Sequence, residues 1–114
     1  MNTRPVDLAH LARYTGGDQA LNAEVLQLFV NQAGELVQRM DSVLQTGDVK
    51  TWKEVAHSLK GAARGIGAFA MANAAEACEP IDPASDANGA AGALRALKTD
   101  SDAVRIFIDA YLDR

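Results

Sequence analysis

The longest apolar stripe in the chain constrains its fold most. Between residues 19 and 45, apolar side chains recur with the 3.6-residue period of an α-helix over about seven turns. They are Val25, Leu26, Phe29, Ala33, Leu36, Val37, Met40, Val43 and Leu44. Asp18 is a suitable capping residue before the stripe, and Gly47 is a suitable stop after it. A helix with one long apolar face must bury that face, and the scattered Val and Ile residues elsewhere favour helices over a sheet as its partners.

Three residues of this stretch do not follow the stripe. Leu28 and Val30 lie about 100° from its centre on a helical wheel, so they either flank the core or form an apolar docking patch for a partner. The wheel leaves both alternatives open. Gly34 interrupts a stretch of good helix-forming residues, and we expect it to mark a close contact with a neighbouring helix.

Four further helices are predicted from apolar periodicity and from capping residues. A short helix begins near Pro5, which suits a first helical turn, and runs to about residue 14. The next two are expected at 49–66, after the capping residue Asp48, and at 69–79. A loop with two prolines over 80–89 separates them from a last helix at 90–113. Residues 99–102 are polar, but we expect this last helix to be continuous.

The short connections between these helices make sequence neighbours antiparallel. The prediction is an all-α protein: an antiparallel, up-down-up-down four-helix bundle preceded by a short extra N-terminal helix. The chain of 114 residues is long enough to bury one core. We therefore expect a single domain over residues 1–114, with an ordered core at about 6–112 and a loose tail at 1–5.

Composition and charge exclude several classes of function. The net charge of −4 argues against binding nucleic acid over the surface. The single cysteine, Cys78, excludes an internal disulfide and a cysteine-based metal site, and we expect it in the core. No run of about 18 apolar residues predicts a membrane span, and the N-terminus lacks the apolar segment of a signal peptide. We expect a cytoplasmic monomer that binds no metal.

The predicted helix at 49–66 carries a histidine at the centre of its polar face. With His57 taken as zero, the residues within about 60° of it on the wheel are Lys50, Lys53, Lys60, Gly61 and Arg64. Glu54 is the one acidic residue close by. The opposite face collects Trp52, Val55, Leu59, Ala62 and Ile66. The helix is therefore amphipathic, and we expect Trp52 to anchor it in the core.

This polar face suits a nucleophile that receives a phosphoryl group. An exposed imidazole is partly neutral, and hence nucleophilic, at pH 7. Cations around it attract a dianionic phosphoryl group and stabilise it once attached. Gly61 puts no side chain beside the histidine, which leaves room for a phosphate or for a partner's active site. Wheel position and charge alone are equally consistent with an ordinary exposed histidine on a charged helix.

The run His57-Ser58-Leu59-Lys60-Gly61 resembles the signature of histidine-containing phosphotransfer (HPt) domains, the helical phosphocarriers of two-component signalling. The family pattern is roughly H-x-L-K-G-[SA]-[SA]-x-x-[IL]-G-A. The chain continues it with Ala62, Ala63, Ile66, Gly67 and Ala68. The segments Gly16-Gly17-Asp18 and Cys78-Glu79, together with Phe29, also resemble the family. The resemblance covers about residues 6–112 and implies an antiparallel bundle with an exposed active histidine.

The resemblance implies a phosphocarrier in a multistep phosphorelay. His57 accepts a phosphoryl group, through Nε2, from a receiver-domain aspartate or a hybrid histidine kinase, and passes it to a response-regulator aspartate. Lys60 is the expected phosphate-stabilising cation, and Gly61 gives steric clearance. Arg64 and Lys53 come second, because they could pair either with the phosphate or with an acidic receiver surface. The expected docking residues are Lys50, Lys53, Glu54, Ser58, Arg64 and Leu28. The chain shows no ATP-binding or kinase motif, so we expect no autokinase activity and no cofactor, with Mg²⁺ held only by the receiver partner.

The chain departs from the family pattern in its secondary phosphate contacts. Ala62 stands where many members have Ser, so a hydroxyl contact to phosphate is absent there. On the fourth helix, only Asn73 and Glu76 are candidates for an additional phosphate contact. The second histidine, His10, has no basic surroundings and is expected to be an ordinary surface residue.

Two other classes of function were weighed against the phosphocarrier. A degenerate bundle could bind receivers or kinases without carrying phosphate, but the intact His57, Lys60 and Gly61 argue against it. A metal-binding bundle needs inward Glu-x-x-His pairs on facing helices. Glu54 and His57 make one such pair, but it faces outward among lysines, so a metal site is not expected.

Overall fold

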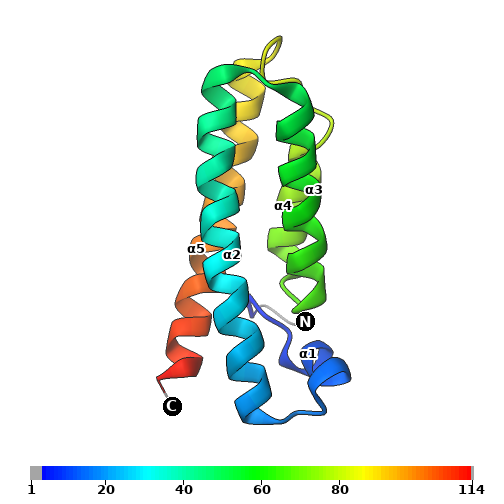
Figure 1. The fold of residues 1–114 in the computed structure, drawn as a ribbon, viewed down its shortest axis with the longest axis vertical. Coiled ribbons are helices and arrows are strands. Elements are labelled where there is room, and N and C mark those ends of the chain that lie inside the picture. Colours follow the sequence, from blue (N-terminus) through cyan, green and yellow to red (C-terminus); the bar gives the residue numbers. More distant parts are fainter. Residues whose placement is uncertain (1–3, 114) are drawn as a thin grey trace.

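A computed structural model describes residues 4–113, and these form five helices and no strand. The helices are α1 (Leu8–Thr15), α2 (Gln19–Thr46), α3 (Val49–Gly65), α4 (Phe69–Cys78) and α5 (Ala87–Leu112). Helices α2 to α5 run alternately up and down and pack in a ring, in which α5 returns to lie against α2 (Figure 1). The predicted all-α bundle with a short extra N-terminal helix is confirmed. The part of the predicted tail at 1–3 lies outside the described residues.

Aspartates begin four of the helices. The carboxylates of Asp7, Asp18, Asp48 and Asp86 each accept a hydrogen bond from the backbone N–H three residues later, at 2.9–3.2 Å. Each bond satisfies one of the amides that the first turn of a helix leaves without a partner. The Thr51 hydroxyl also donates to Asp48, and the two hydrogen bonds from Thr51 lower the pKa of the Asp48 carboxyl.

These caps correct several predicted boundaries. Helix α1 begins at Leu8 rather than near Pro5, because Asp7 supplies the cap that a proline cannot. Helix α5 begins at Ala87, three residues earlier than expected, because Asp86 caps it. Helices α3 and α4 each end one residue before the predicted end. The last helix is continuous through residues 99–102, as predicted.

The core is centred on α3 and α4. Trp52 is fully buried, and its indole N–H donates to the Cys78 carbonyl oxygen over 2.8 Å. Cys78 is also fully buried, as predicted, and burial raises the pKa of its thiol to about 11. Ala72 and Ala75 face the core beside it, and such small side chains let α4 lie close to α3.

Helices α2 and α5, with 28 and 26 residues, are longer than α3 and α4, with 17 and 10. Their lower ends extend past α3 and α4, where α1 lies beside α2 (Figure 1). A polar cluster ties these ends together: the Thr15 hydroxyl donates to the Asn22 side-chain oxygen, and the Asn22 amide donates to the Tyr111 hydroxyl over 3.2 Å.

The N-terminal segment is fixed to the turn between α3 and α4. The Asp7 amide donates to the Gly67 carbonyl over 3.0 Å. Gly67 has a positive φ of 82°, and a Cβ there would lie 2.7 Å from the Asp7 carbonyl oxygen. Both the backbone conformation and the close approach of the chain therefore require glycine at this position.

The structure contradicts one interpretation of an individual residue and refines two others. Gly34 is exposed, and a Cβ there would meet nothing within 4 Å, so it marks no close helix contact. Leu28 is 68% exposed and is not an edge of the core, whereas Val30 is partly buried against it. His10 is only partly exposed, because its ring packs edge-on against Tyr14 and Phe69.

No helix within residues 4–113 has both the length and the apolar character needed to cross a membrane.

Replacing Trp52 with Phe should lower the free energy of unfolding by about 1–3 kcal/mol, since it removes a buried hydrogen bond and leaves unfilled volume. The Cys78 carbonyl keeps a second donor, the Ile81 amide at 3.2 Å, so this carbonyl is not left unpaired. Thermal unfolding followed by circular dichroism measures the change. Tyr14→Phe, on an exposed ring, is the control and should stay within about 0.5 kcal/mol of wild type.

Candidate functional site

His57 lies on the outer face of α3, with its side chain 71% exposed. The opposite face of the helix is buried through Trp52, Val55 and Leu59. This orientation follows from the amphipathic pattern, because burying the apolar face leaves the histidine face in solvent. The predicted position of His57 on the exposed face of this helix is confirmed, whereas Lys60, predicted on the same face, has a side chain that is only 15% exposed.

A carboxylate from another helix end contacts the imidazole. Glu79, the residue directly after α4, places Oε1 3.3 Å from Nδ1 of His57 and 2.9 Å from Nζ of Lys60. Its side chain is only 18% exposed, and that of Lys60 only 15%. One carboxylate oxygen is therefore shared between the histidine and the lysine that follows it by one turn.

The shared oxygen decides which histidine nitrogen is available for chemistry. A carboxylate can only accept hydrogen bonds, so its contact with Nδ1 is a hydrogen bond when Nδ1 carries the proton. In the neutral ring, Nε2 then holds the lone pair. The geometry therefore favours a nucleophilic Nε2 on the exposed edge of the ring.

Lys60 also controls the ionisation of Glu79. Its hydrogen bond is the largest cause that holds the pKa of the Glu79 carboxyl below its ordinary value, while partial burial acts in the opposite direction. The positive charge of Lys60 and the contact with His57 lower the pKa further. The carboxylate is consequently ionised throughout the neutral range and remains an acceptor for Nδ1–H.

Glu79 is the site residue that sequence reasoning missed. The prediction named Glu54 as the acid close to the histidine, and Glu79 appeared only as part of the Cys78-Glu79 resemblance. One signal could have found it: an antiparallel α4 brings its last turn beside the middle of α3, where His57 lies. Which residue of that turn faces the histidine depends on helix packing, which the pattern does not contain.

The remaining basic residues divide into paired and unpaired ones. Arg64 donates to Glu76 of α4 over 2.9 Å, so both residues are engaged with each other in this structure. Lys50 and Lys53 are exposed and form no ion pair with any residue between 4 and 113. Asn73 is exposed on α4 and forms no hydrogen bond with His57, whose side-chain partner is Glu79.

A groove of about 360 Å³ opens beside the histidine. We call it the histidine groove, and its lining residues are Lys50, Lys53, Glu54, His57 and Glu79. Ser58 and Gly61 are exposed on the same helix, and a Cβ at Gly61 would meet nothing within 4 Å. Leu28 is not brought into this group, because it lines a separate apolar depression with Ala23 and Leu112.

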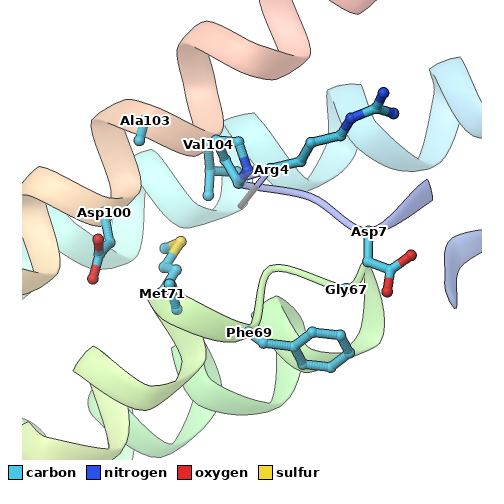
Figure 2. Close-up of a pocket in the computed structure, with 10 residues that line it drawn as sticks. Arg4, Asp7, Gly67, Phe69, Met71, Asp100, Ala103 and Val104 are labelled. Atoms are coloured by element: carbon cyan, nitrogen blue, oxygen red, sulfur yellow. The ribbon is translucent and has the colours of Figure 1, made fainter. Parts of the chain in front are cut away.

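A second pocket, of about 340 Å³, lies between the N-terminal segment, the start of α4 and the middle of α5. Met71 and Val104 line it from facing helices, while the guanidinium of Arg4 extends away from it (Figure 2). It contains no histidine and is separate from the histidine groove. Within the described part of the chain, no three His, Cys, Asp or Glu side chains cluster as a metal site would require.

Replacing Lys60 with Met should raise the pKa of Glu79 toward that of an ordinary glutamate, because it removes the largest cause of the lowering. Since the folded-state pKa is lowered, this contact stabilises the fold above the ordinary glutamate pKa and loses that effect as pH falls through the lowered value. Carbon-13 NMR titration of the Glu79 carboxyl measures the change. Lys53→Met is the control and should leave the titration midpoint in place; equal shifts in both variants would contradict the assignment.

Comparisons with known proteins agree with this geometry. A search of curated protein sequences finds no significant match. The crystal structure of histidine-containing phosphotransfer protein B from Pseudomonas aeruginosa PAO1 superimposes with a TM-score of 0.78 at 23% identity, over 99% of this chain and 98% of that one. This likeness shows a shared fold. The family model described as "Hpt domain" matches residues 24–109, which is more than half of the chain. The chain therefore belongs to the Hpt domain family of histidine-containing phosphotransfer proteins.

Proposed function

We propose that this chain is a histidine phosphocarrier that accepts a phosphoryl group on Nε2 of His57 and passes it on. Its family consists of phosphotransfer proteins of two-component signalling that interact with receiver domains and kinases. The observation that carries the proposal is the exposed imidazole whose Nδ1 faces Glu79. The proposed donor is a receiver-domain aspartyl phosphate or a hybrid histidine kinase, and the proposed acceptor is a response-regulator aspartate.

The transfer step follows from the protonation of the ring. The Nε2 lone pair attacks phosphorus, the Nε2–P bond forms, and the bond between phosphorus and the aspartate oxygen breaks. The carboxylate leaves with the electron pair, and Nδ1 keeps its proton. The phosphorylated ring is therefore positively charged, and Glu79 stabilises it through the Nδ1–H hydrogen bond. Attack on the same phosphorus by an acceptor carboxylate reverses the step and regenerates the neutral ring.

Phosphoryl transfer depends mainly on alignment and on neutralising the charge of the oxygens. We propose that the basic face of α3 contributes cations and that the receiver contributes its own carboxylates and their Mg²⁺. The chain itself then needs no cofactor and does not use ATP. Lys60 is the cation expected to stabilise the phosphoryl group. In the unphosphorylated chain its ammonium contacts the Glu79 carboxylate.

A receiver would dock over the exposed face of α3. Lys50, Glu54 and Ser58 are exposed there, and Arg64 is half exposed despite its ion pair. Leu28 is exposed on α2 outside the histidine groove, so its docking role requires a partner surface that extends beyond the groove. A cytoplasmic location and a monomeric state remain predictions.

Replacing His57 with Gln should abolish labelling when the protein is mixed with a receiver domain carrying radioactive aspartyl phosphate. The wild-type label should be acid-labile and base-stable, as a phosphoramidate is. The matched control is His10→Gln, which changes the other histidine of the chain and should leave labelling intact. Gel autoradiography after quenching measures the label.

A binding module without phosphotransfer would behave differently in the same assay. Neither wild type nor His57→Gln would take label from a panel of receivers, although both would bind them in a titration by calorimetry. That result would replace the phosphocarrier with an interaction protein. Label on His57→Gln would instead place the acceptor elsewhere.

Replacing Gly61 with Ala should raise the stability of the chain but slow phosphoryl transfer. The new methyl group meets nothing in the isolated chain, so the helix should gain about 0.5–1 kcal/mol. In the complex, the same group lies beside the histidine and should slow transfer from a receiver about ten- to hundredfold by displacing the reacting atoms. Thermal unfolding and rapid-quench transfer measure the two effects. Gly92→Ala, at an exposed position of α5 with equally open surroundings, is the control and should change stability alone.

A further inference from the structure

We propose that Lys53 is the residue that contacts the phosphoryl oxygens of phosphorylated His57, and that Lys60 is a positioning residue that acts through Glu79. The inference rests on the proposed phosphocarrier function. It specifies which lysine contacts the phosphoryl group and which one contacts Glu79. It reverses the order of the sequence expectation, in which Lys60 is the first candidate to neutralise the phosphate and Lys53 comes second, pairing with the phosphate or with an acidic receiver surface.

Lys60 is already engaged. Its ammonium lies 2.9 Å from the Glu79 oxygen, and both side chains are largely shielded from solvent. Moving the ammonium to a phosphoryl group would leave a partly buried carboxylate without its cation. It would also release Glu79 from the contact that holds its carboxylate beside the histidine ring. The resting contacts therefore favour a Lys60 that stays in place during transfer.

Lys53 lies where a phosphoryl group on Nε2 would be placed. Side chains of an α-helix lean toward the helix N-terminus, over the residues three and four positions earlier. For His57 these residues are Glu54 and Lys53, and both line the histidine groove with it. Lys60 does not line this groove. With Nδ1 on Glu79, a phosphoryl group on Nε2 would lie beside a groove in which Lys53 is a lining cation and Lys60 is not.

The charges around the groove leave Lys53 as the available cation. Glu79 is matched by Lys60. Lys50 is also exposed without an ion pair among the described residues, but it lies seven residues before His57, whereas Lys53 lies four residues before it. Lys53 has no ion pair among residues 4–113. Glu54 also lines the groove and would repel a phosphoryl group, which increases the need for a cation directly on the phosphoryl oxygens.

The test separates contact with the phosphoryl group from contact with a receiver. Two donors are used: a phosphorylated receiver domain, and phosphoramidate, which presents no docking surface. Transfer from phosphoramidate forms the same Nε2–P bond and breaks the P–N bond of the protonated donor, so that ammonia leaves. The variants are Lys53→Met, the conservative Lys53→Arg, Lys60→Met, and Lys98→Met as the control, since Lys98 lies on α5 outside the histidine groove.

Lys53→Met should slow labelling about ten- to hundredfold with both donors, as expected for loss of a charge-assisted hydrogen bond. Lys53→Arg should restore most of the rate, and Lys98→Met should change it only slightly. Phosphorus-31 NMR titration should show a higher pKa of the phosphoryl group in Lys53→Met, because a nearby cation is lost. Lys60→Met should instead change the nitrogen-15 shifts that report the Nδ1–H form of the imidazole, which Lys53→Met should leave unchanged.

Each other outcome overturns a specific part of the proposal. Slower transfer from the receiver alone would make Lys53 a docking residue. A phosphoryl pKa that rises in Lys60→Met and not in Lys53→Met would return the phosphate contact to Lys60. Wild type that takes no label from either donor would instead contradict the phosphocarrier function itself. Labelled wild type with an equally labelled Lys53→Met would leave that function intact and reject only the assignment of Lys53.

Discussion

The close packing of α4 on α3 is the constraint on which the site depends. Small side chains on α4 let the two helices approach, and the Trp52 indole fixes their register by donating to the Cys78 carbonyl. The next residue along the chain is Glu79, so the same bond determines where its carboxylate lies. A buried hydrogen bond in the core thus sets the orientation of an exposed imidazole. The face that carries His57 is positioned by the interior behind it as well as by its own helix.

Interactions within one helix could be predicted from the sequence. The 3.6-residue period placed the long α2 and the polar face around His57, and the aspartate caps at Asp18 and Asp48 marked true helix starts. Interactions between helices could not be predicted in the same way. The contact of Glu79 with His57 and the pairing of Arg64 with Glu76 depend on the rotation of α4 against α3. Gly34 shows the same limit. A glycine within a helix-forming stretch does not reveal which side of α2 meets a neighbouring helix.

These cross-helix pairs change how the basic face should be described. As a sequence, the face is a group of similar cations around one histidine. In the folded chain, Lys60 and Arg64 are tied to α4, whereas Lys50 and Lys53 extend from α3 without such partners. The residues after the histidine therefore connect it to the bundle. Under the proposed function, Lys53, one turn before the histidine, meets the incoming group.

The chain contains a single tryptophan, and its indole is enclosed at the contact between α3 and α4. Indole emission from the unmodified protein consequently arises at one location, beside the carbonyl that precedes Glu79. Its wavelength and lifetime depend on the polarity around that ring and on its hydrogen bond. The domain thus carries its own optical probe of the scaffold behind the histidine. It distinguishes a partner that only covers the surface from one that also moves α4 against α3.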